Sequence, residues 1–207
     1  MSKPIPLQFG KYYHVYNRGN NRVDIFFEER NYRYFLELYT KYIEPVADTF
    51  AYCLLRNHFH FLVRIKMEEE QRPTVGVSGT PRVSGVFKPK RPSQQFGNLF
   101  NAYAKAINKA YHRTGSLFQN PFGRVEVASE VHLVWLVMYI HHNPQKHGLV
   151  DDFRSWSYSS YLALLSTKPT HLKRDDVLAW FGGVDSFEVS HFQEIPAHQI
   201  ASIALED

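Results

Sequence analysis

The chain lacks the features of a secreted or membrane-spanning protein. Its 207 residues include a single cysteine, Cys53, so no intramolecular disulfide can form and a reducing compartment is expected. No run of about 18 consecutive apolar residues is present. The first ten residues, MSKPIPLQFG, contain no continuous apolar segment of the signal-peptide type. We therefore expect a cytoplasmic protein with no membrane partner.

Several common nucleotide- and metal-binding motifs are also missing. There is no Walker loop, no G-x-G-x-x-G after a strand, no H-E-x-x-H and no C-x-x-C, which disfavours nucleotide-driven, dinucleotide-binding and zinc-finger proteins. What the chain has in excess is aromatic residues, with 16 Phe and 13 Tyr, and positive charge, with a net charge of +4. The rings can fill a core or stack on unpaired bases, and the charge suits a polyanionic partner.

The order of hydrophobic patterns predicts an α+β domain. Expected strands are 11–17, 49–55, 58–66 and 122–128, and expected helices are 31–43, 95–113, 130–142, 158–165 and 175–181. This order favours a ferredoxin-like antiparallel sheet with helices packed on one face. Asn143-Pro144 is expected to end the helix that starts at residue 130.

The domain organisation follows from length and composition. We expect residues 1–166 to form one domain and residues 167–207 to form a C-terminal extension of unknown role. Residues 68–95 are rich in Pro, Gly, Ser and charge, so they are expected to form a flexible loop within the domain.

The segment HFHFLVRIK at 58–66 places two histidines on one side of a strand. Because side chains alternate along a strand, Phe59 and Phe61 face the core while His58 and His60 face the opposite, mostly polar side, where a substrate could reach them. The two imidazoles could share a divalent ion. Two ligands are too few for a site, and such a pair can also be two half-exposed surface histidines.

Tyr139 and Asn143 lie four residues apart on a predicted helix, so a phenol and an amide oxygen would share one helical face. Tyr139 sits in an apolar context and can equally be a core residue, and Tyr103 and Tyr111 are competing candidates. Asn143, which precedes Pro144, can also be no more than a helix terminator.

Basic residues on predicted loops and strand ends are candidates for contacts to DNA phosphates, although most such residues are simply solvated. The candidates are Arg18, Arg22, Arg56, Arg64, Lys88, Lys90 and Arg91. The segment FKPKRP at 87–92 could act as a DNA-contacting arm.

Five segments together resemble a known family. They are YYHVYNRGNNR, AYCLLRNHFHFLVR, NAYAKAINKAYHRTGSLFQNPF, YIHHNPQKHGLV and WSYSSYLALL, which run in order between about residues 10 and 165. The combination resembles the REP-associated tyrosine transposases, members of the HUH single-tyrosine superfamily. The resemblance implies that His58-Phe59-His60 is the HUH motif, that Tyr139 is the nucleophile and that Asn143 completes a site for Mg²⁺ or Mn²⁺.

The resemblance also implies an activity. It is single-stranded DNA cleavage and strand transfer at hairpin or palindromic repeat DNA through a 5′-phosphotyrosine, by a monomer or a homodimer. The loop at 73–93 is longer than is usual in the family, residues after about 166 fall outside the resemblance, and no clear match to the family's Gly-Thr guide-recognition motif is found. Two alternatives remain: a non-catalytic binding protein that stacks bases on Tyr12, His14 and Tyr16, and a metal-dependent nuclease that uses water.

Overall fold

The structure, a computed structural model, describes residues 5–71 and 88–201. Its strands are β1 Tyr12–Arg18, β2 Ala47–Leu54, β3 His58–Ile65 and β4 Gly123–Glu126. Its α-helices are α1 Glu29–Tyr42, α2 Pro92–Ala110, α3 Glu130–Lys146, α4 Tyr161–Leu165, α5 Arg174–Phe181, α6 Val184–Ser190 and α7 Ala197–Ile200. Short 3-10 turns are η1 Asn20–Arg22, η2 Glu69–Gln71 and η3 Phe153–Ser155. All predicted strands and helices are present, with shifted ends.

The four strands form one antiparallel sheet in the order β2-β3-β1-β4. Together with the chain order β1-α1-β2-β3-α2-β4, this is a ferredoxin-like topology. The predicted α+β fold class is confirmed. β2 and β3 are joined by residues 55–57 alone, as expected of a hairpin, and β1 lies directly beside β3.

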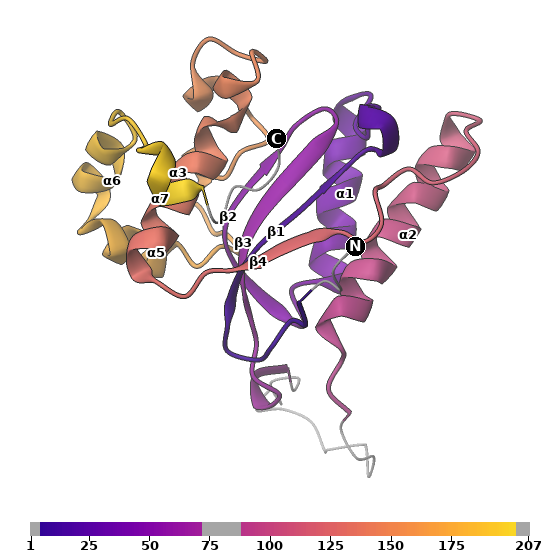
Figure 1. Cartoon of the computed structure of the whole chain (residues 1–207), viewed down its shortest axis with the longest axis horizontal. Coiled ribbons are helices and arrows are strands. Elements are labelled where there is room, and N and C mark those ends of the chain that lie inside the picture. The colour runs from indigo at the N-terminus through magenta and orange to yellow at the C-terminus, as the bar shows by residue number, and fades with distance from the viewer. Residues whose placement is uncertain (1–4, 72–87, 202–207) are drawn as a thin grey trace.

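Helices cover both faces of the sheet (Figure 1). α1 and α2 pack on one face against Phe59, Phe61, Val63 and Ile65 of β3. α3 and the helices after it lie against the other face, where Leu62 is fully buried. The expectation of helices on one face therefore holds for α1 and α2 but not for α3. The reason is that α3 is apolar around much of its surface and buries nine of its 17 residues.

α3 was predicted to end at Asn143-Pro144, but it continues to Lys146. Pro144 lacks the N–H group that would bond to the preceding turn. It lies in the last turn, however, where the N–H groups of His147 and Leu149 donate to the carbonyls of Asn143 and Pro144 at 2.9 Å each. These bonds close the helix end, so α3 gains one further turn.

Both described ends of the segment expected to form a loop at 68–95 contain helical residues. Glu69–Gln71 forms a 3-10 turn, and α2 already begins at Pro92, because proline is well suited to the first turn of a helix. Residues 72–87 lie outside the described residues.

The described part of the expected C-terminal extension, 167–201, shares its core with the rest of the chain. Val177 of α5 and Phe187 of α6 are fully buried in the cluster that contains Leu136 and Ile140 of α3. Lys173 N–H also donates to the Thr49 carbonyl on the edge strand β2 at 2.9 Å. None of the described helices is long and apolar enough to cross a membrane.

Candidate active site

His58 and His60 occupy the start of β3 and point to the α3 side of the sheet. Their exposed fractions are 4% and 0%, and their rings are nearly perpendicular, with centroids 5.0 Å apart. Sequence analysis predicted an open, polar surface at this point. That expectation is wrong, because α3 covers the histidines and turns the sheet face into the floor of an enclosed site.

Each of these two histidines has its Nδ1 atom held by a neighbour. The His58 Nδ1–H donates to Asn57 Oδ1 at 2.6 Å. His60 Nδ1 shares a hydrogen bond of 3.1 Å with Nε2 of His14, a fully buried residue of β1 whose ring stacks on His60. With the Nδ1 side of both rings engaged, Nε2 is the ring nitrogen that can serve as a ligand atom.

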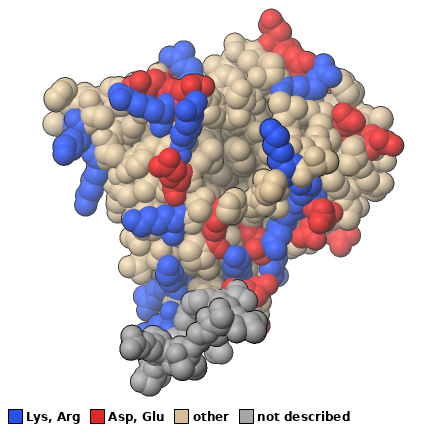
Figure 2. Space-filling view, turned by 180° about the vertical axis from the view of Figure 1, so that it is seen from behind, with Lys and Arg blue, Asp and Glu red and all other residues tan. Residues whose placement is uncertain are grey.

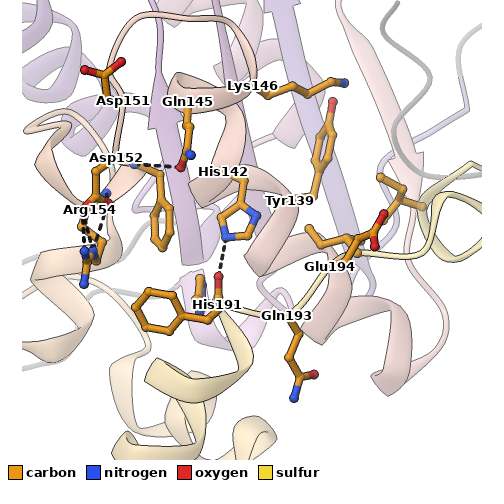
Figure 3. Close-up of a pocket in the computed structure, with 14 residues that line it drawn as sticks. Tyr139, His142, Gln145, Lys146, Asp151, Asp152, Arg154, His191, Gln193 and Glu194 are labelled. Atoms are coloured by element: carbon orange, nitrogen blue, oxygen red, sulfur yellow. Dashed lines mark hydrogen bonds and ion pairs between the residues drawn. The ribbon is translucent and has the colours of Figure 1, made fainter.

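α3 brings Tyr139 to the histidines. Its ring lies edge-on to that of His60, with centroids 5.8 Å apart, and edge-on to His14 at 6.2 Å. The Lys146 Nζ atom lies 5.4 Å from the Tyr139 ring centroid, and Figure 3 shows the ammonium and the phenol hydroxyl on the same side of the helix. The candidate metal pair and the candidate nucleophile therefore meet within one chain.

The competing tyrosines belong to the opposite side of the sheet. Tyr103 is fully buried and donates to the Ile25 carbonyl at 2.7 Å, and burial raises the pKa of its phenol. The Tyr111 hydroxyl donates to a carboxylate oxygen of Glu28 and to Asn31 Oδ1. Both side chains thus have structural hydrogen bonds at the α1–α2 side.

Asn143 lies one helical turn after Tyr139 and is fully buried. Its Nδ2 group donates to the Tyr139 carbonyl at 2.8 Å, and its Oδ1 atom finds no hydrogen-bond donor among the described residues. His147, one turn further on, has its ring 4.8 Å from that of His58. Because residues at i, i+4 and i+8 share a helical face, Asn143 lies on the face that meets the two strand histidines.

The donor set available for a cation is small. Within residues 5–71 and 88–201, no group of three or more His, Cys, Asp or Glu side chains could hold a metal ion. The buried acceptor Asn143 Oδ1 is the candidate for a third group, since a cation would stabilise a buried carbonyl oxygen that has no donor. Two imidazoles and one amide oxygen suit Mn²⁺ or Mg²⁺, with further positions left for phosphate or water oxygens.

The rings considered as a base-stacking platform are partly or fully covered by neighbouring side chains. Tyr12 contacts Phe50 and Trp180 with centroids 5.2 and 5.9 Å apart. His14 stacks with His60 and contacts Tyr16. His14 is fully buried, whereas Tyr12 and Tyr16 are half-buried, and Tyr16 lines the same hollow as His58. The fully buried His14 ring therefore cannot serve as a stacking surface for bases.

Three of the candidate DNA-contacting residues lie beside His58. Arg18 and Arg22 line a hollow of about 350 Å³ that His58 also lines. Arg56 lines a second hollow next to His58, but its guanidinium is paired with Asp24 at 2.7 Å. Arg18 and Arg22 are therefore the basic residues best placed to meet a phosphate approaching the histidines.

Arg64 belongs to an ion cluster at the other end of β3. Its guanidinium lies 2.5 Å from Asp48 Oδ2 and 2.8 Å from Glu70 Oε1, and its side chain is 22% exposed. Lys66 and Lys173 also approach Asp48, each at 3.6 Å. This geometry favours a structural role that links the sheet edge to α5.

Lys88, Lys90 and Arg91 are exposed and lie just before α2, near η2, at the end of the sheet away from the β2–β3 hairpin (Figure 1). Since β3 rises about 3.3 Å per residue, this end is roughly 20 Å from His58. Phe87, the first residue of the expected arm, is not among the described residues. On the face seen in Figure 2, Lys and Arg are interspersed with Asp and Glu.

A chain of buried histidines ties the C-terminal helices to α3. His191 Nδ1–H donates to the Phe187 carbonyl at 2.7 Å, so its Nε2 accepts from His141 Nδ1–H at 2.8 Å. His141 Nε2 then accepts from the Ser160 hydroxyl at 2.8 Å, and His142 Nε2–H donates to the His191 carbonyl at 2.8 Å. Burial lowers the pKa of all three imidazoles, that of His191 to about 4, so they are neutral at pH 7.

The chain is similar to known proteins in sequence and in fold. No family model matches the chain. A protein of Haemophilus influenzae named as a REP-associated tyrosine transposase is 26% identical over 114 residues, which cover 55% of this chain and 58% of the relative. A solved structure of a REP-associated tyrosine transposase bound to a REP hairpin aligns with a TM-score of 0.56 and 15% identity, covering 82% of this chain and 88% of that one.

The chain resembles the REP-associated tyrosine transposases in sequence and in fold. The resemblance found in the sequence is thereby confirmed. The match spans less than two thirds of the length of the H. influenzae relative. The likeness to the solved structure, at its low identity, shows the shared fold.

Three histidines of this region had no predicted role, and His14 was considered only as a base-stacking ring. His141 and His142 lie within YIHHNP, one of the segments that resemble the REP-associated tyrosine transposases, and the pattern gave them no role. His14 has the same strand parity as Tyr12 and Tyr16, a signal that could have placed it on the α3 side of the sheet. For His191, in a short C-terminal helix region, no comparable signal exists.

Proposed function

We propose that the chain is a transposase-type single-stranded DNA endonuclease and strand transferase that acts on hairpin or palindromic repeat DNA, with Tyr139 as nucleophile. The observation that carries the proposal is the 5.8 Å separation of the His60 and Tyr139 rings in one chain. The name of the H. influenzae relative and the hairpin bound to the solved transposase support the choice of substrate.

The chemistry assigned to Tyr139 is a transesterification. A phenol has a pKa of about 10 and is a poor nucleophile at neutral pH. The positive charge of Lys146 beside the ring favours the negative charge that develops on the phenol oxygen. The Tyr139 oxygen forms a bond to phosphorus, the bond from phosphorus to the 3′ oxygen breaks, and the phenol proton is passed through solvent to the departing 3′ oxygen. The products are a 5′-phosphotyrosine and a 3′-OH.

Strand transfer is the reverse reaction with a different strand. Because the phosphotyrosine keeps the ester linkage, a 3′-OH from another DNA end can attack it and release Tyr139 without ATP. The histidines, the tyrosine and Asn143 all come from one chain, so a second copy is not needed to supply these groups. Both a monomer and a homodimer fit this arrangement.

A divalent cation is assigned to His58, His60 and Asn143. The engaged Nδ1 atoms of both imidazoles and the buried Oδ1 atom of Asn143 without a donor support this assignment. When bound, Mg²⁺ or Mn²⁺ would polarise the scissile phosphate and offset its charge in the transition state. Imidazole ligands favour Mn²⁺ over Mg²⁺. Arg18 and Arg22 would hold neighbouring phosphates beside His58.

The test is a covalent-adduct assay with single-stranded hairpin DNA and Mn²⁺, read by denaturing electrophoresis. The parent protein should form a protein–DNA adduct, and Tyr139→Phe should form none. Tyr34→Phe, a matched change at a 37% exposed tyrosine of α1, should leave the adduct intact. His58→Ala should remove cleavage while sparing DNA binding.

Each alternative function has its own outcome in this assay. Cleavage without an adduct would indicate a nuclease that uses water, and binding without cleavage would indicate a non-catalytic binding protein. An adduct that persists in Tyr139→Phe would move the nucleophile to another residue and overturn the assignment.

A further inference from the structure

A cavity of about 770 Å³ opens beside Tyr139, between the second half of α3 and residues 191–200 (Figure 3). Sites that hold small molecules have volumes of about 300–1,000 Å³. Tyr139 and His142, one helical turn apart, form part of the α3 wall, and Phe192 lines the opposite side. Tyr139 lines the cavity, so a nucleotide whose phosphate reached Tyr139 would lie beside it.

The C-terminal wall of the cavity is firmly attached to α3. His191 is 1% exposed and bonds to His141 through its ring and to His142 through its carbonyl, both at 2.8 Å. Phe192 is the next residue along the chain. Its backbone is consequently held at a fixed place relative to Tyr139, although it comes from a segment more than 50 residues away in sequence.

Phe192 and Arg154 lie next to each other at the cavity, and Phe192 is largely exposed. The Phe192 residue is 64% exposed, and the Arg154 guanidinium lies 5.1 Å from its ring centroid. Asp152 holds that guanidinium in place with contacts of 2.6 and 2.9 Å. Aromatic rings and guanidinium planes are the surfaces on which unpaired nucleobases stack.

The charge of the lining favours a base over a phosphate. Lys146 and Arg154 contribute two positive charges, whereas Asp151, Asp152 and Glu194 contribute three negative charges. The net charge of these side chains is −1, which disfavours a second phosphate inside the cavity, whereas the amino group of a nucleobase can donate to a carboxylate.

We propose that this cavity is a nucleobase subsite, which takes the base of an unpaired nucleotide next to the phosphate attacked by Tyr139 and stacks it against Phe192 and Arg154. The proposal rests on the proposed DNA-cleaving function. It gives the C-terminal segment a role in choosing the nucleotide at the cleavage position.

The test compares intact and abasic DNA. Binding of a fluorescent hairpin oligonucleotide with single-stranded flanks is measured by anisotropy, without metal and in a Tyr139→Phe background so that no cleavage occurs. Abasic sites are placed in turn at each position beside the cleavage point, which is mapped with the parent protein. Stacking of one base is worth about 1–3 kcal/mol, so Phe192→Ala should weaken binding of intact DNA about tenfold.

The decisive result is the pairing of one residue with one base. At one position, removal of the base should weaken binding to the parent as much as Phe192→Ala weakens binding of intact DNA. The Phe192→Ala variant should bind that abasic oligonucleotide no more weakly than it binds intact DNA. Phe27→Ala, at another exposed phenylalanine (43%), should have no effect on either oligonucleotide. Equal losses on intact and abasic DNA at every position would overturn the subsite alone. A parent protein that binds no such DNA would overturn the proposed function with it.

Discussion

The edge of the His60 imidazole faces the ring of Tyr139, with centroids 5.8 Å apart and planes at 81°. The two residues come from β3 and α3 and lie 79 positions apart in the sequence. β3 supplies two imidazoles at fixed spacing, and α3 brings the Tyr139 ring edge-on to that of His60. The candidate site therefore depends on how α3 docks onto the sheet.

The hydrogen bonds to the Nδ1 atoms should control cation affinity. Hydrogen bonds with His14 and Asn57 orient the imidazoles of His60 and His58, and removal of such partners typically weakens metal binding by about 10–100-fold. Asn57→Ala and His14→Leu should therefore raise the Kd for Mn²⁺ in calorimetry. His171→Leu, at a 77% exposed side chain, is the control and should leave it unchanged. Unaltered affinity in both test variants, with folding verified by circular dichroism, would contradict this role.

Asn143 should respond to charge as a cation ligand does. Asn143→Asp replaces an amide oxygen with a carboxylate and should lower the Kd for Mn²⁺, whereas Asn143→Ala removes the oxygen and should raise it. In the absence of a cation the Asp variant should be less stable than the parent, because a buried carboxylate is costly without a partner. Calorimetry and thermal unfolding with and without Mn²⁺ check both effects. The Kd for Mn²⁺ should shift in opposite directions in the two variants. Shifts of the same sign would show that Asn143 is not a ligand.

The histidine chain should make stability fall in acid. Burial lowers the pKa of His191 from 6.5 to about 4 in the folded state. Between these values the unfolded chain binds more protons than the folded chain, so the free energy of unfolding rises with pH. The contribution of His191 is fully present above pH 6.5 and is lost as the pH falls toward 4. For this group alone the loss between pH 7 and pH 5 is about 2 kcal/mol.

Denaturant unfolding at pH 7 and pH 5 measures this loss. His191→Gln retains polar hydrogen-bonding atoms but cannot titrate, so its free energy of unfolding should fall by less than that of the parent over the same interval. Identical pH dependence in the two proteins would show that His191 is not held neutral in the folded state.

The arginines should separate into two classes. Arg18→Ala and Arg22→Ala should each weaken hairpin DNA binding and reduce the slope of log K against log salt by about one. Arg64→Ala should leave that slope unchanged and lower the free energy of unfolding by about 1–2 kcal/mol, because it leaves Asp48, at 7% exposed, without its closest cation. Anisotropy titrations over a range of salt concentrations, paired with denaturant unfolding, distinguish the classes. A reduced salt slope for Arg64→Ala would place DNA at the far end of β3.

Much of the sheet and of the site could be predicted from local patterns. The alternation in HFHFLVRIK was sufficient to place both histidines on one face, and the spacing of Tyr139 and Asn143 was sufficient to place them on one helical side. Such patterns do not show which element packs against the histidine face of the sheet. The burial of His58 and His60 under α3 is a tertiary contact, and α3 is too evenly apolar for its sequence to reveal which side meets the sheet.

Two further features, the hydrogen bond of His14 and the role of His191, could not be predicted for similar reasons. The hydrogen bond of His14 to His60 depends on the register between β1 and β3, which pairs Tyr16 with His60 and His14 with Leu62. α6 and α7 have only seven and four residues, too few for a periodic pattern to stand out. The role of His191 as the anchor of the C-terminal segment depends on contacts with His141 and His142 that no sequence spacing indicates.

The measurement that bears most directly on the central claim is the identity of the residue that becomes linked to DNA. After reaction with hairpin DNA and Mn²⁺, the adduct is digested with protease and nuclease, and the nucleotide-bearing peptide is sequenced by mass spectrometry. The site described here predicts a 5′-phosphodiester on Tyr139, in the peptide that contains YIHHN. The same modification on Tyr103, Tyr111 or any other tyrosine would contradict it.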